Sequence, residues 1–346
     1  MINQCQDIRS ISDENLSTIL HKNNFPKYRS KQIKTWATKI SVDSFDKMSN
    51  LPTGLISFLN ENFFIYKSKI ISKQKSQDKT VKYGIKLQDG LVVESVLIPS
   101  NSRVTVCVSS QVGCSLDCNF CATSQLTRMR NLEYYEIYDQ IMLLEKESKE
   151  IFNSKITNIV FMGMGEPLLN YKNVIKSIEY ITSSIGIGIS NKKITLSTSG
   201  VSKMIKRMAD DNVKFNLAVS LHSAIESTRN EIMPFSKSLP IDGLVNSLEY
   251  WYKKTKRKVT FEYLIWEKIN DDYNHINALV KICKRVPSKV NLIEYNKTGN
   301  TKFRQASDMW LQNYLDVLKN NKIPVSVRRS RGKDIEAACG QLANKH

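Results

Sequence analysis

Three cysteines stand within eight residues of this 346-residue chain, in the order Cys114-Ser-Leu-Asp-Cys118-Asn-Phe-Cys121. Thiolates crowded into one short segment are typical metal ligands. Three thiolates are one fewer than a closed structural zinc site or an ordinary four-cysteine iron–sulfur cluster requires. The spacing therefore predicts a metal centre with one open coordination position, where chemistry can take place.

Two alternatives use the same cysteines differently. Offsets of four and seven residues also fit one face of a helix, on which cysteines would pack as small hydrophobic side chains. The preceding stretch Ser109-Ser-Gln-Val-Gly113 argues against a helix, because Ser and Gly interrupt helical runs. The second alternative is a zinc ion, completed by His222 or Cys107, in an RNA-binding protein without enzymatic activity.

The charge balance favours a polyanionic partner. The chain has 51 Lys and Arg side chains against 33 Asp and Glu, a formal net charge of +18. Nucleic acid is the usual partner of so basic a protein, and a merely Lys-rich composition is the alternative explanation. No stretch reaches transmembrane length, no signal peptide is evident, and the odd number of cysteines does not suggest a disulfide scaffold. We therefore expect a cytoplasmic protein without a membrane partner.

The strands and helices that must position the cysteines follow an N-terminal region with a different hydrophobic pattern. Residues 1–65 show helical periodicity and predict a small three-helix accessory domain that binds RNA, with Ser12 as an N-cap. Its basic stretch 27–34 would either bind RNA phosphates or form a solvated surface. Residues 66–102 alternate apolar and polar side chains around the turn signal Gln88-Asp-Gly90, which predicts a β-hairpin extension.

From residue 103 to residue 346, short apolar runs alternate with helical patterns. The runs expected to be strands cover residues 104–108, 156–162, 193–196, 215–221, 259–265, 290–293 and 325–327. The helical segments cover residues 132–150, 171–184, 201–211, 241–255, 271–286 and 305–321. This alternation predicts an α/β fold with a parallel sheet and right-handed crossovers. Because six or so units fall short of a full eightfold barrel, we expect a partial (β/α)6 barrel.

Polar and reactive residues follow several of these strands. After the cysteine loop, the strand ends are Gly163-Met-Gly-Glu166-Pro167, Ser197-Thr-Ser-Gly200, Ser220-Leu-His222-Ser223, Glu294-Tyr-Asn296 and, after the last strand, Ile335-Glu-Ala-Ala-Cys339-Gly-Gln-Leu342. Active sites of parallel barrels collect at the C-terminal strand ends, so we expect these residues to share one face. Simpler roles remain open: Glu166 can cap a helix, His222 can be structural, and Cys107 can be buried core. Likewise, the run Arg328-Arg-Ser-Arg331 can guide RNA or form a solvated face.

These motifs carry a resemblance to a known family. The cysteine motif, followed after the next strand by Gly-Met-Gly-Glu-Pro, resembles the radical S-adenosylmethionine superfamily. Segments 106–114, 161–170, 196–200, 219–223 and 337–342 are similar to one branch, the adenine-C2 methyltransferases of 23S ribosomal RNA and tRNA (RlmN/Cfr family). The resemblance covers essentially the whole chain. Pro167 favours this branch over the sister enzymes that methylate adenine C8 and confer antibiotic resistance.

The resemblance implies a set of cofactors. Cys114, Cys118 and Cys121 would hold a [4Fe–4S] cluster whose fourth iron binds S-adenosylmethionine. Positions that match the family's nucleoside- and methionine-binding residues are Gly165, Glu166, Ser197, Ser220, Leu221, His222 and Asn296. A flavodoxin-type protein would donate the electron that cleaves the cofactor to a 5′-deoxyadenosyl radical.

The resemblance also implies tasks for two further cysteines, because adenine C2 is electron-poor and cannot attack a methyl sulfonium. Cys339 would be methylated by one S-adenosylmethionine, and a second would supply the radical that takes hydrogen from this methyl group. The resulting carbon radical adds to C2 and forms a covalent protein–RNA adduct, which Cys107 releases as it forms a disulfide with Cys339. Glu94 matches the family's proton acceptor, and either Glu94 or Cys107 would remove the C2 proton.

The implied substrates are two RNAs. One is 23S ribosomal RNA at the peptidyl-transferase centre, before it is part of the mature ribosome. The other is tRNA, at the adenosine next to the anticodon. We expect the enzyme to act as a monomer.

Overall fold

The computed structural model describes residues 6–184, 186–298 and 302–344. Within these ranges the largest sheet has ten strands, in the order β14-β13-β12-β11-β10-β9-β6-β5-β4-β3. Neighbours from β6 to β14 are parallel, whereas β3, β4, β5 and β6 pair antiparallel. The strands are β3 (Lys69–Lys75), β4 (Val81–Lys86), β5 (Val92–Ser100), β6 (Arg103–Cys107), β9 (Asn158–Phe161), β10 (Ile194–Thr198), β11 (Asn216–Ser220), β12 (Val259–Leu264), β13 (Ser288–Ile293) and β14 (Val325–Arg328).

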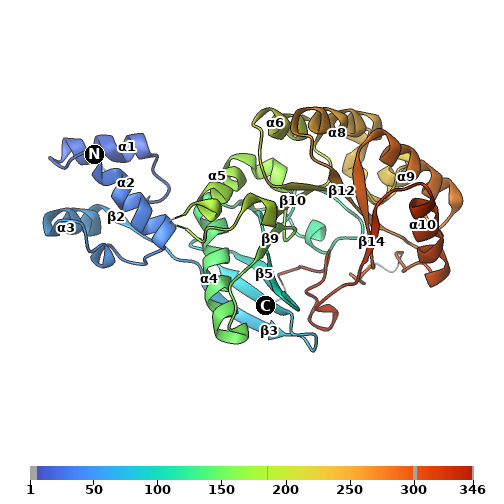
Figure 1. The fold of residues 1–346 in the computed structure, drawn as a ribbon. Helices are drawn as coiled ribbons and strands as arrows, with labels where there is room; N and C mark the ends of the chain where they lie inside the picture. Colours follow the sequence, from blue (N-terminus) through green and yellow to red (C-terminus); the bar gives the residue numbers. More distant parts are fainter. Residues whose placement is uncertain (1–5, 185, 299–301, 345–346) are drawn as a thin grey trace.

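Helices follow the parallel strands and cover the outer side of the curved sheet (Figure 1). They are α4 (Tyr134–Phe152), α5 (Tyr171–Thr182), α6 (Ser202–Asp210), α8 (Ile241–Thr255), α9 (Tyr273–Arg285) and α10 (Asp308–Asn320). Six strand–helix units and a seventh parallel strand confirm the predicted partial barrel in the described part of the chain. None of the described helices is both long and apolar enough to cross a membrane.

The prediction was incomplete at several places. The expected hairpin exists as β4 and β5, but β3 adds a third strand, and β5 continues into the main sheet through β6. β3 lies at the sheet edge with largely exposed side chains, so its sequence lacks an apolar face to detect. The short helix α7 (Glu226–Ile232) was also not predicted.

The N-terminal region has a core of its own. Helices α1 (Asp13–Lys22), α2 (Arg29–Lys34) with its π-helical continuation to Ile40, and α3 (Thr53–Asn62) enclose buried side chains such as Leu16 and Leu55. The predicted cap is confirmed, because the Ser12 hydroxyl accepts a 3.1 Å hydrogen bond from the Asn15 N–H. Two short strands, β1 (Gln6–Asp7) and β2 (Phe63–Phe64), close this unit and were not predicted.

A buried ionic network fixes this region against α4. Arg9 is 1% exposed, and its Nη1 donates to both carboxylate oxygens of Asp139 at 2.9 and 3.0 Å. Its Nη2 donates to Asp7 Oδ2 at 2.8 Å, and the Tyr134 hydroxyl donates to the Arg9 carbonyl. These charges are paired and hydrogen-bonded, as buried charges must be.

The barrel is not closed by strand pairing. β14 pairs with β13 only, and β6 pairs with β5 and β9. The chain after β14 instead crosses to the antiparallel strands (Figure 1). There Arg331 Nη2 donates to the Asp78 carbonyl at 2.6 Å, and Asn344 Nδ2 donates to the Val92 carbonyl at 2.7 Å. We call residues 329–344 the C-terminal segment.

Candidate active site

A cavity of about 240 Å³ is lined by the C-terminal strand ends of the barrel. The predicted site residues in its wall are Cys107, Cys114, Cys118, Cys121, Gly165, Glu166, Ser197, Ser220, His222, Asn296 and Cys339. Residues from five different strand ends and from the C-terminal segment thus meet at one place, as expected for a parallel barrel. Two predicted residues, Leu221 and Glu94, are fully buried and do not line this cavity.

The cysteine loop is a loop, as predicted, but a short ladder closes its base. Strands β7 (Gln111–Val112) and β8 (Arg130–Asn131) pair antiparallel on either side of it. Gly113 has φ +76°, and a Cβ there would lie 2.6 Å from the Thr127 carbonyl oxygen, so the turn into the loop requires glycine. Within the loop, the Ser124 hydroxyl donates to the carbonyls of Cys118 and Cys121.

The three loop thiols form a donor set that fits an iron–sulfur cluster. Burial raises the pKa of Cys114 to about 11 and also raises the pKa values of Cys118 and Cys121. Each thiolate would further disfavour the others, so three thiolates here require a cationic centre. No three His, Cys, Asp or Glu side chains of the described residues lie close enough to share a single metal ion. A [4Fe–4S] cluster fits this donor set, because each ligated iron takes one thiolate and the sulfurs need not converge on one point.

The second strand end places Glu166 between the cavity and two backbone amides. Its carboxylate accepts hydrogen bonds from the N–H groups of Leu168 at 3.1 Å and Ser199 at 2.7 Å, which confirms the capping role. Gly165 has φ +91°, and a Cβ there would lie 2.5 Å from Gln111 Cβ. The Gln111 side chain also accepts a 2.9 Å hydrogen bond from the Glu166 N–H. The hydrogen bond between Gln111 and Glu166 fixes the turn that contains Gly163 and Gly165 in the cavity wall.

His222 is a neutral cavity residue. Burial, and then the charge of Arg229, lower its pKa to about 3. Its Nδ1 accepts a 3.3 Å hydrogen bond from the Leu264 N–H, so the ring proton is on Nε2. The structural role is therefore confirmed, and His222 lies in the cavity wall as well. The adjacent Leu221 contributes a backbone N–H that donates to the Glu262 carbonyl at 3.1 Å.

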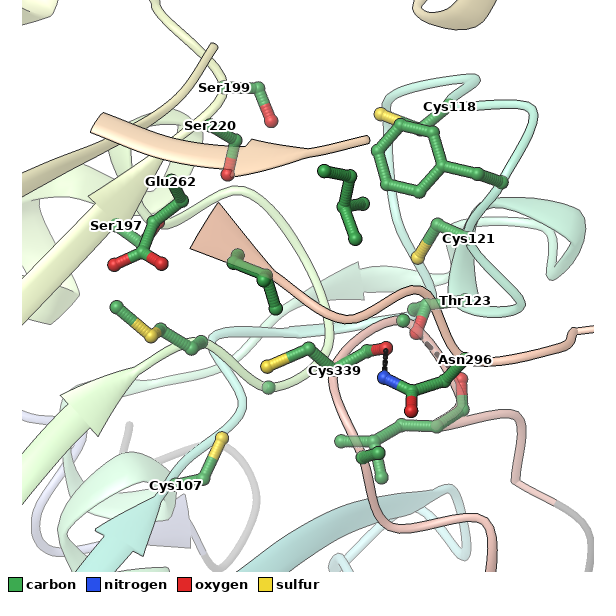
Figure 2. A pocket seen from close by; sticks show the side chains of 18 of the residues that line it. Cys107, Cys118, Cys121, Thr123, Ser197, Ser199, Ser220, Glu262, Asn296 and Cys339 are labelled. Atoms are coloured by element: carbon green, nitrogen blue, oxygen red, sulfur yellow. Dashed lines mark hydrogen bonds between the residues drawn. The ribbon is translucent and has the colours of Figure 1, made fainter. Parts of the chain in front are cut away.

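Three hydrogen bonds hold Cys339 beside the cysteine loop. The Ala122 N–H donates to the Gly340 carbonyl at 2.7 Å, and the Thr123 hydroxyl donates to the Leu342 carbonyl at 2.6 Å. Asn296 Nδ2 donates to the Cys339 carbonyl at 3.3 Å (Figure 2). Cys339 itself is exposed, so its sulfur is available for reaction.

Cys107 and Cys339 occupy one side of the cavity. Figure 2 shows both sulfurs directed into the same region, with Cys121 and Cys118 beyond Cys339. Burial, and then the nearby Cys339 sulfur, raise the pKa of Cys107 to about 12. Cys107 is thus a buried strand residue, as its sequence position indicates, and also a cavity residue.

Glu94 holds the C-terminal segment from outside the cavity wall. Its Oε2 accepts hydrogen bonds from the N–H groups of Ala343 at 2.8 Å and Asn344 at 3.2 Å. Lys82 Nζ lies 3.4 Å from the other carboxylate oxygen, Oε1. The carboxylate therefore anchors the segment that carries Cys339.

Sequence reasoning missed Glu262, a cavity residue, and assigned Arg328 only to a basic run. Glu262 stands within β12, where all six residues are buried. One charged residue among five apolar or weakly polar ones was the available signal, because a buried charge needs a partner.

Known proteins share this arrangement. The model of the Radical SAM superfamily matches residues 108–279. A Flavobacterium johnsoniae protein named probable dual-specificity RNA methyltransferase RlmN is 58% identical over 340 residues, which cover 98% of this chain and 97% of that protein. A Salinibacter ruber protein of the same name is 40% identical over 349 residues, covering 98% and 94%. A crystal structure of a radical SAM methyltransferase from Sphaerobacter thermophilus matches with a TM-score of 0.88 and 33% identity, covering 97% of this chain and 99% of that one. The chain therefore belongs to the RlmN family of dual-specificity RNA methyltransferases, within the radical SAM superfamily.

Proposed function

We propose that this protein methylates C2 of adenosine in 23S ribosomal RNA, and of the adenosine next to the anticodon in tRNA. The observation that carries the proposal is that Cys107, Cys339 and the three loop cysteines line one cavity. Neither a zinc-stabilised binding protein nor direct methyl transfer needs two further thiols in this place.

The cofactor residues fit this reaction. A [4Fe–4S] cluster at Cys114, Cys118 and Cys121, with S-adenosylmethionine bound to it, would supply radical chemistry. The cavity wall offers the cofactor hydroxyl groups at Ser197 and Ser220 (Figure 2). Gly165, whose missing Cβ makes room for the Gln111 side chain, presents its backbone in the cavity wall. The remaining proposed cofactor-binding residues are Glu166, Leu221, His222 and Asn296.

Cys339 is the proposed methyl carrier. Adenine C2 is not nucleophilic, so the methyl group must first be placed on a nucleophile of the protein. The exposed Cys339 thiol takes that methyl group from one S-adenosylmethionine, and a second one is consumed in activating it. Its position beside the cysteine loop, set by Ala122 and Thr123, supports this role.

Cys107 is the proposed releasing thiol. Once the carbon is attached to C2, the RNA remains bound to Cys339, and Cys107 frees it by forming a disulfide. For Glu94 we propose positioning, because its carboxylate is engaged by Ala343 and Asn344. It would take the C2 proton only after releasing these amides.

The proposed partners follow from the substrate. A target base must leave its stack to enter a cavity, so ribosomal RNA is best modified before the ribosome is mature. The net charge of +18 supports RNA binding. We further propose a flavodoxin-type electron donor, a monomeric enzyme and a cytoplasmic location.

The test is nucleoside mass spectrometry of RNA treated with anaerobically purified protein. We expect a brown protein that converts adenosine to 2-methyladenosine. Formation of 8-methyladenosine instead would show that the protein methylates adenine C8, like the sister enzymes. A colourless protein with one zinc ion and no methylated product would overturn the proposed function altogether.

A further inference from the structure

We propose that Glu262 and Arg328 form a recognition pair for the target adenine, reading the ring edge that carries N1 and the exocyclic amino group. This inference rests on the proposed function and names the residues that would recognise the target adenine.

A relay of hydrogen bonds orients Glu262 across three neighbouring strands. The Ser326 hydroxyl donates to Asn291 Oδ1 at 2.8 Å, and Asn291 Nδ2 donates to Glu262 Oε1 at 2.9 Å. Glu262 is 4% exposed and lines the cavity beside Ser197 and Ser220 (Figure 2). Its second oxygen, Oε2, accepts no hydrogen bond from any described residue. A buried carboxylate oxygen without a donor is costly, so this atom is best explained by a ligand.

Arg328 supplies a donor next to that acceptor. It ends β14 and lines the cavity, and its Nη1 lies 3.9 Å from Glu262 Oε2 and 3.6 Å from Met162 Sδ. The 3.9 Å separation is too long for a hydrogen bond, so each group can still bind a third partner. Arg328, Cys107 and Cys339 line the same cavity, so the guanidinium shares this space with both thiols.

The pair matches adenine and opposes guanine. Adenine presents a donor at its amino group and an acceptor at N1, which a carboxylate and a guanidinium can pair with. Guanine presents an acceptor and a donor at the corresponding positions, so both contacts would be repulsive. Enzymes that act on an extruded base read it through this edge.

The pair would also assist the chemistry. N1 is bonded to C2, so a guanidinium at N1 places positive charge one bond from the atom that is attacked. The cofactor contains adenine too, and the same contacts would suit it. We assign the pair to the RNA base because Arg328 lines the same cavity as Cys339, from which the new carbon would be delivered.

Glu262→Gln is an informative variant, because the relay predicts its orientation. Asn291 Nδ2 is a donor, so the Gln oxygen takes the place of Oε1 and the Gln amide NH₂ points into the cavity. The variant thus replaces an acceptor by a donor with little change in shape. Glu249→Gln, a partly exposed carboxylate paired with Arg285 on the outer helices, is the matched control.

The experiment measures dissociation constants of the anaerobic holoenzyme for two RNAs, with adenosine or purine riboside, which lacks the amino group, at the target position. We expect wild type and Glu249→Gln to prefer adenosine about 10-fold or more. Glu262→Gln should lose this preference while keeping wild-type iron content and thermal unfolding. An unchanged preference in Glu262→Gln would overturn the recognition pair.

A second arm measures the dissociation constant for S-adenosylmethionine. We expect Glu262→Gln to leave it within about 2-fold of wild type. A weakening of about 10-fold there, with the RNA preference intact, would assign the pair to the cofactor and overturn the proposal. Absence of 2-methyladenosine in the wild-type reaction would instead overturn the proposed function, so the two failures are distinguishable.

Discussion

The backbone N–H of Ala122 donates a 2.7 Å hydrogen bond to the carbonyl of Gly340. Ala122 directly follows the last cysteine of the loop, and Gly340 directly follows Cys339. The cysteine loop and the C-terminal segment are therefore aligned by their backbones, one residue beyond Cys121 and Cys339. This backbone hydrogen bond, together with those from the Thr123 and Asn296 side chains, fixes the position of Cys339 relative to the cysteine loop.

Thr123→Val should loosen this alignment. The substitution removes the hydroxyl that donates to the Leu342 carbonyl and leaves that acceptor without its partner, at a cost of about 1–3 kcal/mol. Amide hydrogen exchange of residues 337–344 should become about 10-fold faster. Ser124→Ala is the control, because its hydroxyl bonds only Cys118 and Cys121 and should leave this exchange unchanged. Equal protection in both variants would contradict the alignment.

Glu94→Gln separates anchoring from proton transfer. Breaking the buried pair with Lys82 should lower the free energy of unfolding by about 3 kcal/mol, measured by urea denaturation. If Glu94 positions the C-terminal segment, the variant should also slow methylation of Cys339, followed by mass spectrometry of its peptide. Normal methylation of Cys339 with a block only in the later RNA step would show that Glu94 is the proton acceptor.

Alanine variants of Cys339 and Cys107 should block the proposed reaction at different steps. Cys339→Ala should abolish RNA methylation, because no carrier receives the methyl group. Cys107→Ala should accumulate covalent protein–RNA adduct, visible as a shifted band on a denaturing gel. Cys283→Ala, a buried cysteine of α9 that does not line the cavity, should form 2-methyladenosine and no adduct. Wild-type turnover by Cys339→Ala would disprove the carrier role.

Release of the adduct should depend on pH. The pKa of Cys107, raised to about 12 by burial and then by Cys339, makes it a neutral thiol near pH 7. Below that pKa the thiolate fraction rises tenfold for each pH unit, so release should accelerate about 100-fold between pH 7 and pH 9. Rapid mixing of preformed adduct with buffers of different pH measures the rate. A flat profile would mean that a neighbouring group already deprotonates Cys107.

The sequence predicted the parallel sheet well because its strands are buried. All residues of Val259–Leu264 are buried, and such runs are recognisable without knowing their neighbours. The edge strand Lys69–Lys75 was missed because exposed side chains leave no apolar pattern. Helix Glu226–Ile232 was missed because it is too short to show a clear helical period of apolar residues.

The site was predicted where function is concentrated in motifs, and missed where it depends on contacts between distant segments. Residue types and spacing identified the cysteine loop and Cys339. Nothing in the local sequence indicates that Glu94 binds the amides of Ala343 and Asn344. Glu262 can likewise be recognised as a site residue only once the fold brings Arg328 close to it.

The unpaired edge of β14 has an energetic consequence. If another strand closed the barrel by pairing with this edge, opening that side would require breaking a continuous strand ladder. Instead the side is covered by the C-terminal segment, held by separate hydrogen bonds such as those of Arg331 and Asn344. Each such bond contributes about 0.5–1.5 kcal/mol, and breaking these bonds would leave every strand pair of the sheet intact. Cys339, the proposed methyl carrier, thus lies on a segment whose attachment to the barrel is independent of the strand ladders.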